Sequence, residues 1–324
     1  MKLTCKLKPV GMQQRRIEGN DQLFMKRTII SLLAVCLCIG FTAFGAVSDA
    51  AAPADAATMS AEELWQAGED AKEAEDYETA LQYYRQAAAQ DFAAALRSIG
   101  SLYFHGNGVE QSYDEALAYW QAAADQGDAK AFYSLGYMYG GGYGVEQSFE
   151  KAAEYYLLAA EKGEPLGYSI LGNMYYFGEG FEQSYETALS YYQLAADEGV
   201  ADARYNLGLM YMYGIAVEQS YKTGAEYWLL SAEQGNPYAQ EGLGCLYVAG
   251  LGVEQSYEKA LDYFQRAADQ DFANAFEDLG EMYENGLGVE QSYEKAAEYY
   301  RQAVERGVQE AAEKLDALST GFDN

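Results

Sequence analysis

The sequence predicts an all-α protein, an α-solenoid of antiparallel helix pairs in repeats of 36 residues. The tetrapeptide Val-Glu-Gln-Ser recurs at this constant interval, and one copy has phenylalanine in place of valine. The copies begin at Val109, Val145, Phe181, Val217, Val253 and Val289. Leu-Gly recurs in the same phase, with Ile99-Gly100 as its first copy, and a tyrosine follows each glycine by three residues. A fixed interval of this length is the signature of stacked helical repeats.

Each repeat contains the signals for two helices. In the first full copy, apolar residues fall at helical spacing from Phe92 to Phe104, which predicts the first helix. The glycines of Gly106-Asn107-Gly108 then break the helix. Ser112 can accept a hydrogen bond from a free backbone N–H and so opens the second helix. Gly127 ends that helix.

The ends of the array differ from its middle. We expect six repeats over residues 92–307 and a lone capping helix with a short tail over 308–324. A capping element with a polar outer face covers the last apolar surface of a solenoid. Residues 60–91 form a helix pair with a shorter turn, which resembles a tetratricopeptide unit and forms the N-terminal cap. Residues 48–59 are a small, polar linker.

Residues 1–47 have the plan of an export leader. Lys26 and Arg27 precede an apolar run, Ile29–Val47, followed by small residues. Met25 directly precedes this segment and is the expected start of translation; the alternative is that residues 1–24 form an unusually long basic n-region. The run is also nearly long enough to span a bilayer, so an uncleaved membrane anchor is the alternative to a cleaved signal peptide. Either arrangement places the repeats outside the cytoplasm, as a periplasmic, secreted or anchored protein.

The charge of the chain excludes several classes of partner. The formal net charge is −29, and the leader is basic, so the repeats are more acidic than the whole. A surface this acidic repels nucleic acid and anionic membranes. We therefore expect no nucleic-acid partner, and membrane contact only through an uncleaved leader.

The motifs together resemble the Sel-one-like repeat (SLR) family. Each 36-residue repeat combines several motifs: Leu-Gly-x-x-Tyr, then Gly-x-Gly-Val, then Tyr-Tyr followed by Ala-Ala and Gly. Lys151-Ala152 matches the Lys-Ala step of the family. Lys259-Ala260 and Lys295-Ala296 repeat that step. Serine replaces the usual aspartate before the second helix, and Gly214-Ile215-Ala216 lacks the second loop glycine. The resemblance implies a right-handed α-solenoid that serves as an adaptor in signalling, envelope assembly or secretion.

First-helix positions that vary between copies are the candidates for binding a protein or peptide partner. Aromatic pairs that recur in every copy are best explained as framework. First helices line the concave side of such arrays, and variation there is what a binding groove would show, although neutral drift predicts it too. Aromatic and methionine side chains are favoured contact residues. The proposed groove residues are Phe132, Tyr133, Tyr137, Tyr168, Tyr176, Tyr205 and Met212.

The residues give no support for catalysis, a cofactor or a metal site. The sole histidine, His105, stands beside the first loop, where a lone histidine is usually exposed to solvent. The sequence offers no triad candidates and no zinc spacing. Some cysteine-rich SLR proteins are β-lactamase-like hydrolases, but they carry a cysteine pair in each repeat, and the repeats here hold only Cys245. A further alternative to an adaptor is a structural envelope spacer.

The leader generates a test of topology. Alkaline phosphatase fused after Asn324 should be active, because the enzyme matures only outside the cytoplasm. An inactive fusion, with activity only from a cytoplasmic reporter at the same position, would contradict export.

Overall fold

The computed structural model describes residues 58–321, which are helical throughout and include no strand. They form two compact units, 58–184 and 185–321. The helices of the N-terminal unit are α2 (Ala61–Glu73), α3 (Tyr77–Ala88), α4 (Ala93–His105), α5 (Tyr113–Asp125), α6 (Ala129–Gly141), α7 (Phe149–Glu161) and α8 (Leu166–Phe177). Those of the C-terminal unit are α9 (Tyr185–Asp197), α10 (Ala201–Tyr213), α11 (Tyr221–Glu233), α12 (Pro237–Ala249), α13 (Tyr257–Ala268), α14 (Ala273–Asn285), α15 (Tyr293–Glu305) and α16 (Gln309–Gly321).

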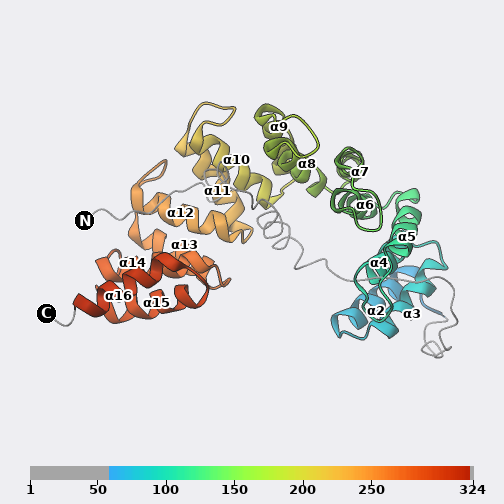
Figure 1. Ribbon diagram of the computed structural model, residues 1–324, viewed down its shortest axis with the longest axis horizontal. Helices are drawn as coiled ribbons and strands as arrows, with labels where there is room; N and C mark the ends of the chain where they lie inside the picture. The colour runs from blue at the N-terminus through green and yellow to red at the C-terminus, as the bar shows by residue number, and fades with distance from the viewer. Residues whose placement is uncertain (1–57, 322–324) are drawn as a thin grey trace. The chain divides into compact units, whose positions relative to one another are not determined.

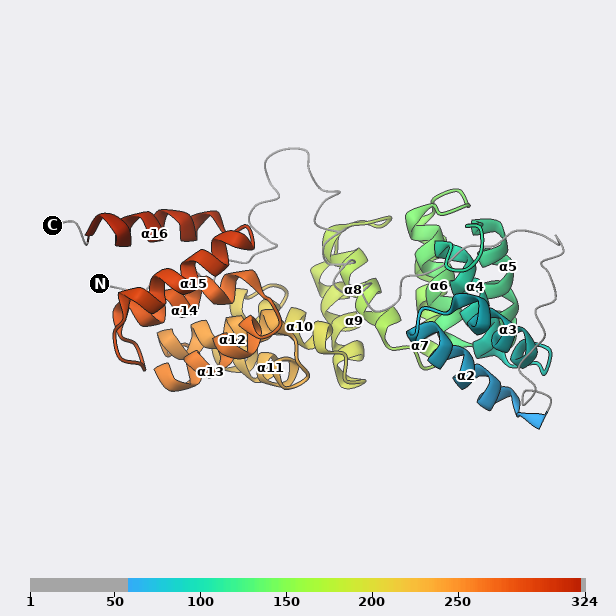
Figure 2. The ribbon, with the colours of Figure 1, turned by 90° about the horizontal axis from the view of Figure 1, so that it is seen from below.

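Within each unit, every helix packs on the helices before and after it in the chain. This holds from α2 to α8 and again from α9 to α16 (Figure 1). Figures 1 and 2 both show α14, α15 and α16 side by side at the end of the C-terminal unit. The predicted all-α solenoid of helix pairs is confirmed, and α4, α6, α8, α10, α12 and α14 are the first helices of the six repeats.

The Val-Glu-Gln-Ser motif connects the two helices of a repeat. The serine caps the second helix: Ser148 Oγ accepts from the N–H of Lys151 at 3.2 Å. The preceding glutamine reaches back, so that Gln147 Nε2 donates to the carbonyl of Gly140 at 2.8 Å. That carbonyl belongs to the last turn of α6, where helix geometry leaves carbonyls without partners. The same glutamine bond recurs in every repeat, through Gln111, Gln183, Gln219, Gln255 and Gln291.

The glycine of Leu-Gly allows the two helices of a pair to approach closely. A Cβ added at Gly136 would lie 2.8 Å from Cδ1 of Tyr156 on α7. At Gly208 the same atom would lie 2.2 Å from Cδ1 of Trp228 on α11. Any side chain at these positions would displace an aromatic ring from the core.

The second loop glycine joins one repeat to the one before it. Gly144 has φ of +67°, and an added Cβ would lie 2.3 Å from Cβ of Tyr113, at the start of the preceding second helix. In the fourth repeat alanine replaces this glycine, and Ala216 keeps the left-handed conformation with φ of 57°. The backbone of the family loop is thus retained, although a left-handed residue with a Cβ costs about 1–2 kcal/mol.

Both ends of the described chain are helical. The shorter turn expected within 60–91 is Ala74–Asp76, between α2 and α3, and Ser60 forms a capping box with Glu63 at the start of α2. Within residues 308–324, for which a capping helix and a short tail were predicted, α16 packs on α15. The leader and most of the linker lie outside the described residues. Across residues 58–321, no helix combines the length and the apolar character that a membrane crossing requires.

Replacing Ala216 with glycine should stabilise the protein. Glycine adopts positive φ without the Cβ penalty, which is partly offset by its greater freedom in the unfolded chain, so we expect a gain of about 1 kcal/mol. The measurement is the denaturant midpoint of Ala216→Gly. The control is Ala297→Gly inside α15, which should lose about 0.5–1 kcal/mol. An unchanged or lower midpoint for Ala216→Gly would contradict the assignment of strain.

Candidate functional site

Recurring tyrosines stack in pairs that join the first helix of a repeat to the second. The rings of Tyr103 and Tyr119 lie 5.4 Å apart with an interplanar angle of 14°. Equivalent stacks are Tyr139–Tyr155, Tyr211–Tyr227, Tyr247–Tyr263 and Tyr283–Tyr299. The structure therefore confirms that the recurring aromatics are framework.

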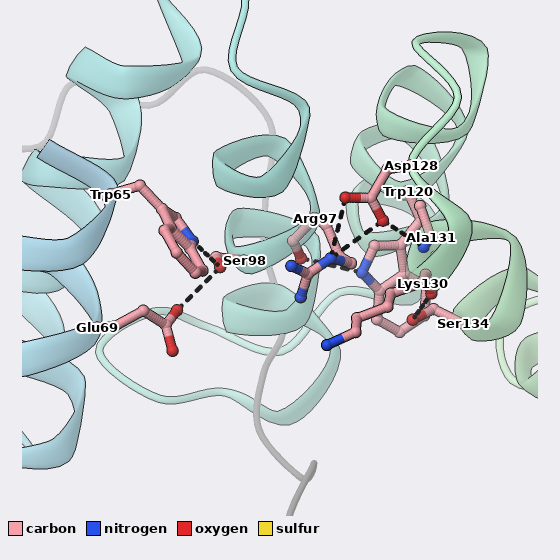
Figure 3. Close-up of polar contacts among 9 residues, drawn as sticks. All are labelled: Trp65, Glu69, Arg97, Ser98, Trp120, Asp128, Lys130, Ala131 and Ser134. Carbon is pink, nitrogen blue, oxygen red and sulfur yellow. Dashed lines mark hydrogen bonds and ion pairs between the residues drawn. The ribbon is translucent and has the colours of Figure 1, made fainter. Parts of the chain in front are cut away.

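Polar contacts complete this framework in the N-terminal unit, as Figure 3 shows. The indole Nε1 of Trp120 donates to the carbonyl of Arg97 at 3.1 Å. The Arg97 guanidinium pairs with Asp128 at 3.1 Å, and Asp128 also caps α6 through the N–H of Ala131 at 2.7 Å. Arg97 occupies a first-helix position whose residue differs between repeats. In the first repeat this arginine holds the start of the next repeat through Asp128.

A second network ties the first helix pair to α4. Trp65 Nε1 donates to Ser98 Oγ at 3.0 Å, and Ser98 Oγ donates to Glu69 at 3.0 Å (Figure 3). The Tyr84 hydroxyl donates to the same carboxylate at 2.6 Å. Burial alone would raise the pKa of Glu69, but hydrogen bonds from Lys72, Tyr84 and Ser98 lower it overall. These groups are satisfied within the fold and have a structural role.

Five of the predicted groove residues lie in the N-terminal unit. Phe132, Tyr133 and Tyr137 on α6 and Tyr168 on α8 are half-buried, while Tyr176 is buried at 8% exposure. The first four therefore keep part of their surface open to solvent. Tyr176 offers almost none, which contradicts its predicted place on a binding surface.

Tyr133 and Tyr137 belong to an aromatic cluster that spans neighbouring repeats. The ring of Tyr133 lies 5.3 Å from that of Tyr156, and the Tyr137 ring stacks on Tyr143 at 5.1 Å. Tyr137 also approaches Phe104 of the preceding repeat at 5.9 Å. Burial, with the hydrogen bond to Tyr143, raises the pKa of Tyr137. Each ring is thus packed on one side against another aromatic ring, and the Tyr137 hydroxyl donates to the Tyr143 hydroxyl at 3.2 Å.

The other two predicted residues lie in the C-terminal unit and differ from each other. Tyr205 is half-buried and stacks on Trp228 at 5.6 Å. Met212 is 1% exposed and fills the space beside Gly224, where an added Cβ would lie 2.5 Å from Met212 Cγ. The other repeats have alanine at the Gly224 position, such as Ala152. Met212 is therefore a core residue that compensates for this glycine, and its predicted exposure is wrong.

The structure reveals an acidic cluster, which the sequence did not predict, on the first helices of the last two repeats. It consists of Glu241 on α12, Glu277, Asp278 and Glu281 on α14, with Lys314 on α16. Lys314 forms ion pairs with Glu277 and Glu281. The signal was present, because glutamates occupy variable first-helix positions only in these last repeats. What the pattern did not reveal is that the carboxylates of successive repeats meet.

Two carboxyls of this cluster are difficult to ionise. Burial, with added repulsion from the charge on Glu277, raises the pKa of Glu241 to about 7. Burial likewise raises the pKa of Asp278, with added repulsion from Glu241 and Glu281. Carboxylate oxygens of Glu241 and Asp278 lie within 4.8 Å of each other, together with Cys245 Sγ. Among the described residues this is the one group of three potential metal ligands so close together, and its mixed donors differ from the all-oxygen sets of calcium sites.

His105 differs from expectation in its surroundings. It is the last residue of α4 and is half-buried, with its ring 4.9 Å from that of Phe104. Burial lowers its pKa to about 3, so the imidazole is neutral at physiological pH. The expected solvent exposure is therefore wrong, and its neighbour Phe104 belongs to the aromatic cluster.

Fold and contacts together define a repeat scaffold, whose framework positions recur while its first-helix surface varies. The Sel1 repeat profile matches residues 54–92, 93–128, 129–164, 165–200, 201–236, 237–272 and 277–308. The chain belongs to the Sel1 repeat family. The profile finds seven repeats where the interval of Val-Glu-Gln-Ser had indicated six, because it also matches the first helix pair.

Solved structures support the same assignment. A protective antigen present in uropathogenic Escherichia coli strains, which displays an SLR fold, is 31% identical with a TM-score of 0.70 over 81% of this chain. The match spans 57% of the length of that antigen. A Sel1 repeat protein from Oxalobacter formigenes is 30% identical with a TM-score of 0.68, over 74% of this chain and 99% of its own. No curated protein matches the chain.

The raised pKa of Glu241 predicts how stability depends on pH. An unfolded glutamate titrates near pH 4.3, about the reference value. Between that pH and about 7 the folded protein holds a proton that the unfolded chain releases, so stability falls as the pH rises through this window and stays lower above it. Glu241→Gln should therefore raise the melting temperature at pH 8 and leave it unchanged at pH 4.

The matched control for this measurement is Glu254→Gln. Glu254 is exposed in the loop before α13, so the variant removes the same charge outside the cluster. An equal gain at pH 8 in both variants would assign the effect to net charge instead of to Glu241.

Proposed function

We propose that the chain is an exported scaffold that binds a protein or peptide partner on the face formed by its first helices, the concave face expected of such arrays. One observation carries the proposal. One first-helix position carries four kinds of side chain across the six repeats: Arg97, Tyr133, Ser169, Tyr205, Glu241 and Glu277. Framework positions in the same helices hardly change. A surface that varies on a constant frame is how repeat proteins achieve specific binding.

The half-buried aromatics supply the contact residues of this proposal. Tyr133, Tyr137 and Tyr205 each pack one side of the ring against the framework and remain partly open. A ring already held in place loses little conformational entropy on binding, which favours it as an anchor. Phe132 and Tyr168 add half-buried aromatic rings on the N-terminal unit, whereas Tyr176 and Met212 are buried and leave the proposed set.

Export is supported by the leader sequence, and a non-catalytic role by the family. The hydrolase alternative is tested by nitrocefin turnover with the purified protein. The spacer alternative predicts that no partner is captured specifically from envelope extracts.

The test of binding compares variants of the full chain. The wild type should capture a partner from envelope extracts, and Tyr133→Ala, Tyr137→Ala or Tyr205→Ala should each cost about 1–3 kcal/mol in affinity for it, as binding hot spots do. Phenylalanine at the same positions should retain most of the affinity, because the ring remains. Affinity is measured well below the melting temperature, with helicity checked by circular dichroism.

The control is a framework ring. Tyr139→Ala removes a ring stacked on Tyr155 and should lower stability while leaving affinity unchanged. Unchanged affinity in all three groove variants would move the site to another surface. Equal losses in groove and framework variants would show that the groove tyrosines act only through stability.

A further inference from the structure

The acidic cluster contains one cation that shows how it is built. Lys314 of α16 reaches between Glu277 and Glu281 of α14 and pairs with both. Its ammonium also lies 5.7 Å from the centre of the Tyr300 ring. The side chains of Glu277 and Glu281 are only 14% and 12% exposed in these pairs. A lysine side chain therefore fits here with its charge offset by two carboxylates.

The neighbouring half of the cluster is Glu241 and Asp278, and the ion pairs of Lys314 are with Glu277 and Glu281 instead. Asp278 Oδ2 is shielded from solvent and has no hydrogen-bond partner. A carboxylate oxygen of Glu241 lies within 4.8 Å of an Asp278 oxygen, so the two groups repel each other when both are ionised. A shielded carboxylate oxygen that lacks a partner costs free energy, about 1–3 kcal/mol or more for a charged group. Either protonation of the carboxyl or a cation bound beside the two carboxylates would remove this cost.

We propose that Glu241 and Asp278 bind a lysine or arginine side chain of a basic segment in the partner protein, beside the site that Lys314 already occupies. The inference rests on the proposed scaffold function and assigns the charge of its partner. Arginine is the favoured side chain, because its planar guanidinium carries several N–H donors and so can serve more than one carboxylate oxygen. The cation would be to Glu241 and Asp278 what Lys314 is to Glu277 and Glu281. The net charge of −29 adds long-range attraction for such a segment.

The proposal also predicts a dependence on pH. Binding requires the ionised carboxylates, so affinity should rise as the pH increases from 5 to 8, through the raised pKa of Glu241. Other titratable groups face these acids from the neighbouring helices. They are Tyr205 and Tyr213 on α10, Glu277 and Glu281 on α14, and Lys314 on α16.

The experiment uses the full chain and a fluorescein-labelled hexa-arginine peptide, with binding followed by anisotropy. We expect Glu241→Gln and Asp278→Asn each to weaken binding about tenfold or more, as loss of a partly buried charge partner does. The control variants Glu254→Gln and Glu290→Gln remove the same charge at exposed loop positions and should change affinity less than about twofold, as surface charges do. Because Glu241→Gln is expected to be more stable at pH 8, its loss of binding cannot come from unfolding.

Three outcomes would overturn the proposal. Equal weakening by all four variants would show attraction to net charge alone. Binding that does not change between pH 5 and 8 would show that the raised carboxyls take no part. Zinc or calcium ions that bind with dependence on Glu241 and Asp278, while these variants leave peptide binding intact, would show a metal site instead.

The outcomes also separate this inference from the scaffold function. A peptide that depends on Glu241 and Asp278, with no partner captured from extracts, would support the cation site and contradict the scaffold. A captured partner that depends on the groove tyrosines and is indifferent to Glu241 and Asp278 would support the scaffold and contradict the cation site.

Discussion

The fold depends on the contact between a glycine in the first helix of each repeat and an aromatic ring in the second. Gly100 receives the edge of Trp120, and one turn later Tyr103 stacks on Tyr119. Residues three apart share a helix face, so adjacent aromatics on one helix meet a glycine and a tyrosine on the other. This arrangement sets both the separation of the helices and their register. The Leu-Gly-x-x-Tyr motif supplies the glycine and the tyrosine that make these contacts.

Much of the fold could be predicted because its determinants repeat. A serine cap, a loop glycine or a stacked tyrosine is local, and six copies in phase remove the ambiguity of any single one. The surface was harder to predict. Met212 looked like a contact residue by type, and only the absence of a side chain at Gly224 shows why it turns inward. The acidic cluster needs Lys314, from the last helix of the described chain, to meet α14, and no spacing rule contains that contact.

The two candidate surfaces relate differently to stability. Tyr133 and Tyr137 extend an aromatic cluster, so the residues proposed for binding also support the fold. Glu241 and Asp278 lower stability at neutral pH, because burial and crowding make them harder to ionise in the folded protein than in the unfolded chain. Natural proteins keep such unfavourable groups where function requires them. The framework contacts of every repeat supply the stability that lets the acidic positions persist.

The second loop glycine shows that neighbouring repeats pack on each other as closely as the two helices of one repeat do. Gly108 lies against Tyr77, in the preceding helix pair, as closely as Gly100 lies against Trp120 within its own repeat. The contacts that join one repeat to the next are therefore as close as the contacts within a repeat. A segment of 36 residues therefore contains the residues for both kinds of packing contact, whichever residue it begins at. Unequal recombination within the gene could then lengthen or shorten the array at many breakpoints and still yield a protein that folds.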